Sequence, residues 1–196
     1  MAQIVLTDAT PLVYLSQVNG GLSWLKRLFG PVDMTHVVKG EATKSGKPGA
    51  AEVDAALQHG DLRVLTDDWS EPKFPWLDEG EASTIRAAIN LAKLGHTCLV
   101  LMDEKAGRDE IKHLGSPAII VSGTAAVVGR AREVGLVSSA ADVFKELREK
   151  SFYISEDLVR GILESVGEAD RAKGLPSPPG HKIRPRTEAR AKRRRH

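Results

Sequence analysis

The chain has little cysteine, few aromatic residues and no long apolar segment. Its single cysteine, Cys98, excludes an internal disulfide and fits a protein of a reducing compartment. No run approaches the roughly 20 apolar residues that a membrane-spanning helix needs. Asp8 comes too early for the apolar core of a secretory signal peptide. We therefore expect a soluble, cytoplasmic protein that makes no membrane contact.

The charge is distributed unevenly along the 196 residues, although the net charge is only +2. Residues 171–196 contain ten Lys or Arg and one acid, Glu188, a local net charge of +9. Residues 1–170 contain 18 Lys or Arg and 25 acids, a net charge of −7. The sequence therefore describes an acidic body with a strongly basic end, which differs from a mildly basic protein.

Short apolar runs alternate with amphipathic segments through most of the chain. This alternation is typical of an α/β domain in which helices cover a parallel sheet. The runs predict strands at 3–7, 34–38, 62–65, 99–102 and 118–121. The amphipathic segments predict helices at 11–18, 22–29, 50–59, 80–94, 105–114, 124–134, 140–150 and 155–166.

The pattern ends near Ala169. Residues 175–180 are rich in proline, and residues 182–196 are basic with almost no apolar side chains. Such a segment cannot bury enough surface to become ordered. We predict one domain over residues 1–168 and a disordered basic tail over residues 169–196.

Acidic residues follow the predicted strands or begin a helix. Asp8 follows the first strand, Glu41 comes soon after the second, and Asp103 ends the run at 99–102. Glu81 lies in the first turn of a predicted helix, where the helix dipole favours negative charge. Side chains at the carboxyl edge of a parallel sheet converge in space, so we expect these four acids to share a crevice.

Clustered carboxylates suit Mg²⁺ or Mn²⁺, which prefer oxygen ligands. Without a cation such carboxylates repel one another and take up protons. A divalent ion at this place can activate water and stabilise charge on a phosphoryl group. Each acid also has a purely structural interpretation, as a turn, N-cap or solvated first-turn residue. By that interpretation Asp78 and Glu79 are solvated neighbours of Glu81.

Four segments, in order, resemble motifs of PIN-domain proteins, in particular the VapC-like branch. They span about residues 3–165 of the chain. The branch reads D-[TS]-S-P-L-I, L-x-x-G-E-x-x-x-I, L-x-D-[DE]-x-x-A-R, and G-T-x-G-x-L with A-x-x-x-G-[LI]. The matching segments here are residues 8–15, 77–85, 101–108, 123–128 and 131–136.

The resemblance implies a three-layer α/β/α sandwich with a central parallel sheet and an Mg²⁺-dependent nuclease site. It implies a ribonuclease toxin that acts on single-stranded or structured RNA, forms a homodimer and is neutralised by a small antitoxin protein. It assigns catalysis to Asp8, Glu41, Glu81 and Asp103, and metal ligation to Asp8, Glu81 and Asp103. It assigns supporting roles to Thr10, Glu104 and Thr124, and RNA contact to Arg108.

The chain departs from the motifs at two places. Ala9 replaces a hydroxyl residue after the first acid, and Ala126 replaces a glycine. The basic tail also lies outside the family pattern. None of these departures removes an acid, so a metal-dependent ribonuclease is the leading interpretation.

Two other functions are compatible with parts of the sequence. A non-catalytic protein could keep the fold and bind nucleic acid or a partner through the tail, whose cations could contact phosphates in a salt-sensitive manner. The relevant residues are Arg190, Lys192, Arg193, Arg194 and Arg195. A phosphatase of the haloacid dehalogenase type would need a second Asp two residues after Asp8, where Thr10 stands.

Overall fold

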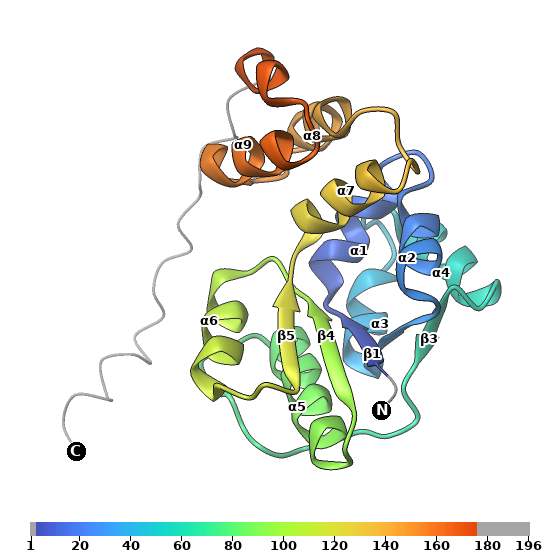
Figure 1. Cartoon of the computed structure of the whole chain (residues 1–196). Helices are drawn as coiled ribbons and strands as arrows, with labels where there is room; N and C mark the ends of the chain where they lie inside the picture. Colours follow the sequence, from blue (N-terminus) through green and yellow to red (C-terminus); the bar gives the residue numbers. More distant parts are fainter. Residues whose placement is uncertain (1–2, 176–196) are drawn as a thin grey trace.

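The computed structural model describes residues 3–175, and its centre is a parallel sheet (Figure 1). The sheet has five strands in the order β3-β2-β1-β4-β5. These are β1 (Gln3–Thr7), β2 (Val32–Met34), β3 (Leu62–Val64), β4 (Thr97–Leu101) and β5 (Ile119–Ser122). The strands β1 and β4 are neighbours, with Leu6 opposite Val100, so the ends of these two strands meet at one edge.

Helices cover both faces of the sheet, which confirms the predicted three-layer α/β/α class. The described helices are α1 (Ala9–Ser16), α2 (Gly21–Phe29), α3 (His36–Ala42), α4 (Ala50–Gln58), α5 (Glu79–Lys93), α6 (Lys105–Leu114), α7 (Thr124–Glu133), α8 (Ala140–Glu149) and α9 (Glu156–Ser165). A 3-10 helix, η1 (Ala169–Gly174), follows them. None of the helices between residues 3 and 175 is long and apolar enough to cross a membrane.

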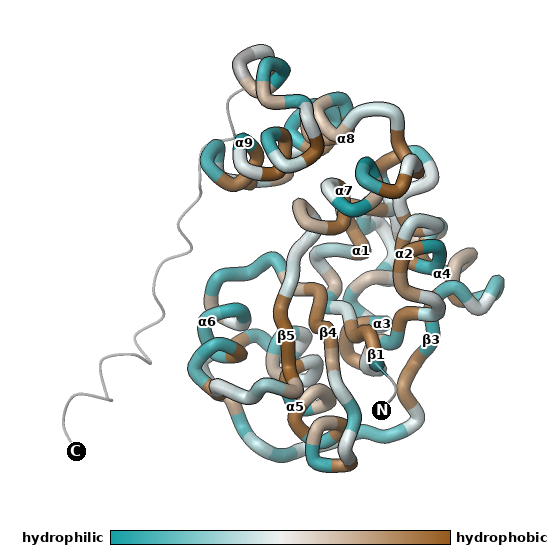
Figure 2. Tube along the Cα trace, in the orientation of Figure 1, coloured by the Kyte–Doolittle hydropathy of each residue, from teal (hydrophilic) through white to brown (hydrophobic). Residues whose placement is uncertain are grey.

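Alternate side chains of the central strands enter two separate apolar cores. Leu6 and Val100 pack in the core beneath α5 and α6. Val5 and Leu101 pack in the larger core that the N-terminal helices share with α7, α8 and α9. In Figure 2 the tube carries hydrophobic colours along much of β4 and β5 and hydrophilic colours along most of α6. This period of two fixes the register of the strands, because a one-residue slip would exchange the two faces.

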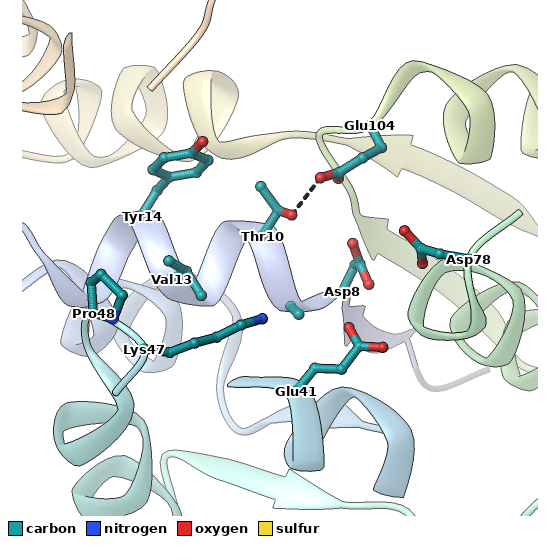
Figure 3. Close-up of a pocket in the computed structure, with 10 residues that line it drawn as sticks. Asp8, Thr10, Val13, Tyr14, Glu41, Lys47, Pro48, Asp78 and Glu104 are labelled. Atoms are coloured by element: carbon teal, nitrogen blue, oxygen red, sulfur yellow. Dashed lines mark hydrogen bonds between the residues drawn. The ribbon is translucent and has the colours of Figure 1, made fainter. Parts of the chain in front are cut away.

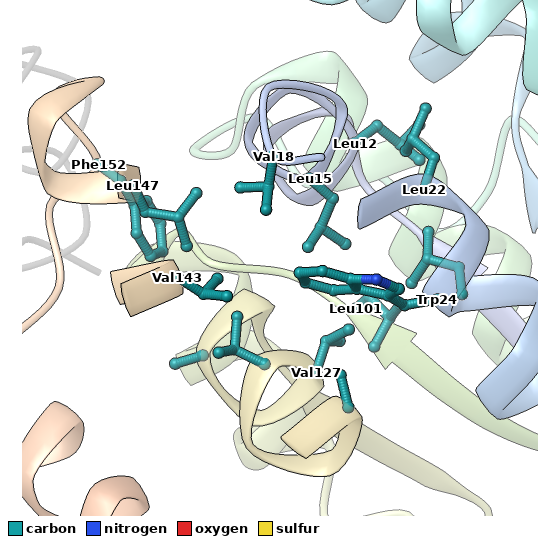
Figure 4. Packing of buried hydrophobic residues seen from close by; sticks show 14 of the residues in the cluster. Leu12, Leu15, Val18, Leu22, Trp24, Leu101, Val127, Val143, Leu147 and Phe152 are labelled. Atoms are coloured by element: carbon teal, nitrogen blue, oxygen red, sulfur yellow. The ribbon is translucent and has the colours of Figure 1, made fainter. Parts of the chain in front are cut away.

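The larger core contains Trp24, which is 4% exposed and lies among Leu15, Leu101 and Val127 (Figure 4). Trp24 is therefore a core residue. The same core continues to Phe152, which joins the C-terminal helices to the body of the domain.

The side chain of Glu168 connects the C-terminal helices to one another through hydrogen bonds. Its carboxylate accepts hydrogen bonds from the backbone amides of Ala140 and Ala141 at 3.1 and 3.0 Å, and from Ser139 Oγ at 2.9 Å. Arg132 on α7 donates to the same carboxylate at 2.7 Å. Burial acts to raise the pKa of Glu168, but these hydrogen bonds outweigh it and lower the pKa to about 2. The carboxylate is thus charged at any ordinary pH.

Two local expectations were wrong. The segment predicted as a strand over 34–38 is a strand only to Met34, and α3 begins at His36 because Thr35 Oγ1 caps it by accepting a hydrogen bond from the amide of Val38 at 3.2 Å. The predicted tail begins with η1, which packs against α9. The tail cations predicted to bind RNA, from Arg190 to Arg195, lie outside the described residues.

Candidate active site

A pocket of about 260 Å³ opens where β1 and β4 end. Four carboxylates meet at one end of it, each from a different part of the chain (Figure 3). Asp8 precedes α1, Glu41 lies on α3, Asp78 precedes α5, and Glu104 follows β4. The structure therefore brings distant acids together at this edge of the sheet; of the four acids predicted to share it, Asp8 and Glu41 line the pocket, whereas Glu81 and Asp103 do not.

Asp8 is the most deeply placed of these acids, with 3% of its surface exposed. The backbone amide of Asp8 donates to the carbonyl of Leu101 at 2.9 Å, which ties the end of β1 to the end of β4. Burial raises the pKa of Asp8 well above its usual range, and the charges of Glu104, Asp78 and Glu81 raise it further. Only the backbone amide of Ala9 acts in the opposite direction.

Glu41 faces Asp8 across Gly80, at the start of α5. A Cβ atom at position 80 would lie 2.7 Å from Glu41 Oε2 and 3.2 Å from Asp8 Oδ1, so only glycine leaves both carboxylates in place. Burial raises the pKa of Glu41, with a contribution from Asp78. The ammonium of Lys47 and the backbone amide of Gly80 partly offset this increase in pKa.

Asp78 and Glu81 form a capping box at the N-terminus of α5. Asp78 Oδ1 accepts from the amide of Glu81 at 3.0 Å, and Glu81 Oε2 accepts from the amide of Asp78 at 3.4 Å. Burial and the charges of Asp78 and Glu104 raise the pKa of Glu81 to about 7. Glu81 does not line the pocket, whereas Asp78 does. Asp78 was not expected to contribute, although the D-x-x-E spacing is itself the signal of a capping box.

Asp103 faces the start of α7 rather than the pocket. Its Oδ1 accepts from the backbone amide of Thr124 at 2.8 Å, and its Oδ2 accepts from Thr124 Oγ1 at 2.5 Å. Burial raises the pKa of Asp103 to about 6, while both hydrogen bonds from Thr124 and the nearby guanidinium of Arg108 restrain the increase. Asp103 thus links β4 to α7 through its hydrogen bonds with Thr124.

Glu104 is the acid that follows β4 into the pocket. Thr10 Oγ1 donates to Glu104 Oε1 at 2.5 Å, which holds the carboxylate toward Asp8. The other oxygen, Oε2, is buried and has no hydrogen-bond partner among residues 3–175. Leaving a buried carboxylate oxygen without a partner is costly, so this oxygen is poised to bind a ligand.

The donor chemistry of the pocket fits a hard divalent cation. Burial and neighbouring carboxylates raise the pKa of Asp8 and of Glu41, and the buried Glu104 Oε2 has no hydrogen-bond partner in the described part of the chain. Between residues 3 and 175, no three His, Cys, Asp or Glu side chains are arranged closely enough to enclose an ion by themselves. Mg²⁺ is commonly held by one or two carboxylates together with several waters, so its binding does not require three such side chains.

Other predicted contributors lie elsewhere. Arg108 sits beside Gly123 and donates to the carbonyl of Met102 at 3.4 Å, away from the pocket lining. Trp76 also lies outside the pocket lining and donates to Glu110 at 3.0 Å.

The sequence of the chain identifies its family. A sequence model of the PIN domain matches residues 4–168. The chain is a PIN-domain protein. The PIN domain is a nuclease-type fold, and PIN-domain nucleases are hydrolases that act on nucleic acids and typically use divalent metals. No curated protein matches the chain in sequence.

Proposed function

We propose that this PIN-domain protein is a divalent-metal-dependent endoribonuclease that hydrolyses RNA phosphodiester bonds in the acidic pocket. The observation that carries the proposal is the convergence of Asp8, Glu41, Asp78 and Glu104, with a buried and unpartnered oxygen on Glu104. A structural role does not account for that oxygen, because a buried carboxylate that only stabilises the fold is normally saturated with hydrogen bonds, as Glu168 is.

In the proposed mechanism, Asp8 and Glu104 would hold Mg²⁺ or Mn²⁺. Glu81 and Asp103, which the sequence predicted as ligands, lie behind them and contact the starts of α5 and α7. When bound, the ion would activate a water and neutralise charge on the scissile phosphate. Glu41 lies across from Asp8 and has a raised pKa. A carboxylate whose pKa is raised is a stronger base and is suited to accept a proton from the attacking water.

We further propose that the substrate is single-stranded RNA and that the biological context is a toxin–antitoxin pair. A pocket lined by side chains can admit a splayed nucleotide, whereas an A-form duplex hides its base edges. A homodimer and a small antitoxin protein follow from the resemblance to VapC-like proteins. Size-exclusion chromatography with light scattering tests the dimer.

The first experiment is cleavage of a mixed single-stranded RNA pool with Mg²⁺, with Mn²⁺ and with EDTA. We compare the wild type with Asp8→Asn, Glu104→Gln and Asp103→Asn. We expect metal-dependent cleavage that Asp8→Asn and Glu104→Gln each reduce at least about 100-fold, the scale on which removing one stabilising group affects a transition state. Asp54→Asn, on the exposed surface of α4, is the matched control and keeps full activity.

The Asp103→Asn variant distinguishes the role of Asp103 from that of Glu104, the two acids that follow β4. It weakens the hydrogen bonds to Thr124, so we expect a lower melting temperature together with reduced cleavage. Glu104→Gln reduces cleavage without that loss of stability. No cleavage by folded wild-type protein with either metal would reject the nuclease and favour a PIN-fold protein that only binds nucleic acid or a partner.

A further inference from the structure

The end of the pocket opposite the acids is lined by other residues. Val13 and Tyr14 on α1 and Lys47 and Pro48 in the loop before α4 line it (Figure 3). Apolar surface, a phenol ring and a cation therefore adjoin the carboxylates within one pocket of about 260 Å³. A phosphodiester that is cut at the acidic end must place the neighbouring nucleotide somewhere along this lining.

Lys47 is held over the pocket by its loop. Its backbone amide donates to the carbonyl of Lys44 at 3.0 Å, and its carbonyl accepts from the amide of Ala50 at 3.3 Å. At Gly49, with φ of +80°, a Cβ atom would collide with Ser16 Oγ on α1, so the loop lies directly against that helix. In Figure 3 the side chain of Lys47 extends along α1 toward Asp8 and Glu41.

The ammonium of Lys47 is available for a ligand. It forms no ion pair within the described part of the chain, although its charge lowers the pKa of Glu41. A cation that faces carboxylates without pairing to them can bind a phosphate that arrives with its own metal ion. Lysine is suited to this task because its ammonium acts as a compact point charge.

The ring of Tyr14 packs against the C-terminal part of the domain. Its ring lies on that of Phe152 with centroids 4.2 Å apart and an angle of 54° between the planes. Phe152 is 3% exposed and is held by a hydrogen bond from its amide to the carbonyl of Leu147 at 2.9 Å. A ring held in this manner can contact a ligand in the pocket with little loss of side-chain entropy.

We propose that Val13, Tyr14, Lys47 and Pro48 form a subsite for the RNA nucleotide adjoining the scissile phosphate. Lys47 contacts the phosphate of that nucleotide, and Tyr14 and Pro48 pack against its ribose and base. The subsite rests on the proposed function, since it assumes that the acids cut RNA. It makes Lys47 and Tyr14 binding and positioning residues rather than catalytic ones.

The test measures binding apart from cleavage. A fluorescein-labelled 12-nucleotide single-stranded RNA is titrated in EDTA, by anisotropy, at several salt concentrations. We expect Lys47→Ala to raise Kd about three- to tenfold at low salt, and to reduce the slope of log Kd against log salt by about 0.7, the value for one lost phosphate contact on a single strand. Lys47→Arg restores the slope. Lys44→Ala, in the same loop but outside the pocket lining, changes neither quantity.

Tyr14→Phe and Tyr14→Leu test the other half of the subsite. Phenylalanine keeps the ring on Phe152, so its Kd stays within about twofold of the wild type, whereas leucine raises Kd at least about fivefold, as loss of one ring–base contact does. In cleavage assays with metal, Lys47→Ala raises KM and changes kcat little, because it removes binding that substrate and transition state share. Melting temperatures confirm that each variant is folded.

The outcomes separate the two proposals. Metal-dependent cleavage in which Lys47→Ala leaves KM and the salt slope unchanged overturns the subsite and keeps the nuclease. RNA binding that depends on Lys47 and Tyr14, without cleavage under either metal, keeps the subsite and overturns the nuclease. A wild type that neither binds nor cuts the RNA overturns both.

Discussion

Three acids in or beside the pocket, Asp8, Glu41 and Glu81, carry an electrostatic cost. Burial and mutual repulsion raise the pKa of Asp8 and Glu41, and they raise the pKa of Glu81 to about 7. The folded chain therefore holds protons that the unfolded chain has already released. Stability must then fall as the pH rises from the ordinary carboxyl range near 4 toward 7, the reverse of the effect of Glu168.

Replacing the most buried acid relieves this cost. We expect Asp8→Asn to raise the free energy of unfolding by about 1 kcal/mol at pH 8 in EDTA, because it removes a desolvated charge among other carboxylates. Near pH 4 the wild-type carboxyl is itself neutral, so the difference disappears. Urea unfolding at both pH values measures it.

Asp54→Asn serves as the surface control and changes stability by less than about 0.5 kcal/mol at either pH. An Asp8→Asn variant that is less stable than the wild type at pH 8 would show that the carboxylate stabilises the metal-free fold. The gain in stability accompanies loss of cleavage, which is the expected trade-off at a functional site.

At the scale of elements, the close approach of α3 and α5 depends on Gly80. We expect Gly80→Ala to displace the Glu41 carboxylate, because the added Cβ atom would lie 2.7 Å from Oε2. Helix propensity favours alanine by up to about 1 kcal/mol, so the variant stays folded. The value of kcat should fall at least about tenfold with little change in melting temperature.

Gly161→Ala on α9 is the matched control, since a Cβ atom there meets nothing within 4 Å. It should leave kcat unchanged. Full activity in Gly80→Ala would show that Glu41 can move aside without consequence, and would remove it from the proposed mechanism.

The packing of α7, α8 and η1 depends on Glu168. The difference between its pKa of about 2 and the ordinary 4.5 corresponds to about 3 kcal/mol of stability at neutral pH. This contribution is complete above the ordinary pKa and is lost as the pH falls toward 2. We expect Glu168→Gln to lower the free energy of unfolding by about that amount at pH 7 and to have a smaller effect near pH 3.

Glu164→Gln, an exposed change on α9, controls for the loss of one negative charge. Equal effects of Glu164→Gln and Glu168→Gln would mean that overall charge, rather than the hydrogen bonds of Glu168, decides stability.

The same elements show why local sequence was sufficient in some places and not in others. The apolar runs before Asp8 and Asp103 correctly predicted β1 and β4, because period-two burial and strand ends are local properties. Val37 and Val38 favour a strand by propensity, yet the cap at Thr35 begins α3 there. The hydrogen bond from the amide of Val38 to Thr35 Oγ1 favours a helix here over the strand propensity of the two valines. Glu41 therefore lines the pocket from a helix, α3.

At the scale of the whole molecule, the sequence combines an acidic body with a basic end, and under the proposed function both would meet the same RNA. Residues 176–196 contain eight Lys or Arg and one acid. We expect deletion of these residues to weaken RNA binding and to lower the salt slope, because fewer cations reach phosphates, while kcat stays constant. Anisotropy and steady-state cleavage measure the two effects.

A deletion that leaves both affinity and salt slope unchanged would show that these residues take no part in binding. A deletion that lowers kcat as well would indicate that they act at the pocket itself.

The location of the pocket could be predicted from the sequence, whereas its exact membership could not. Parallel strands place their carboxyl ends together, so Asp8 and the Asp103–Glu104 pair were bound to meet. Which of two adjacent residues enters the pocket depends on the turn from β4 into α6 and on long-range partners. Thr124 holds Asp103 and Thr10 holds Glu104, and neither contact has a local signal.

The neighbouring positions of β1 and β4 have a consequence for the chain while it is being made. Asp8 leaves the ribosome early, but Glu104 and the strand beside β1 follow much later, and Phe152 behind Tyr14 later still. No early fragment contains the full set of acids. Under the proposed function, a nascent chain that ends before Glu104 lacks part of the acidic set and would not cleave its own message.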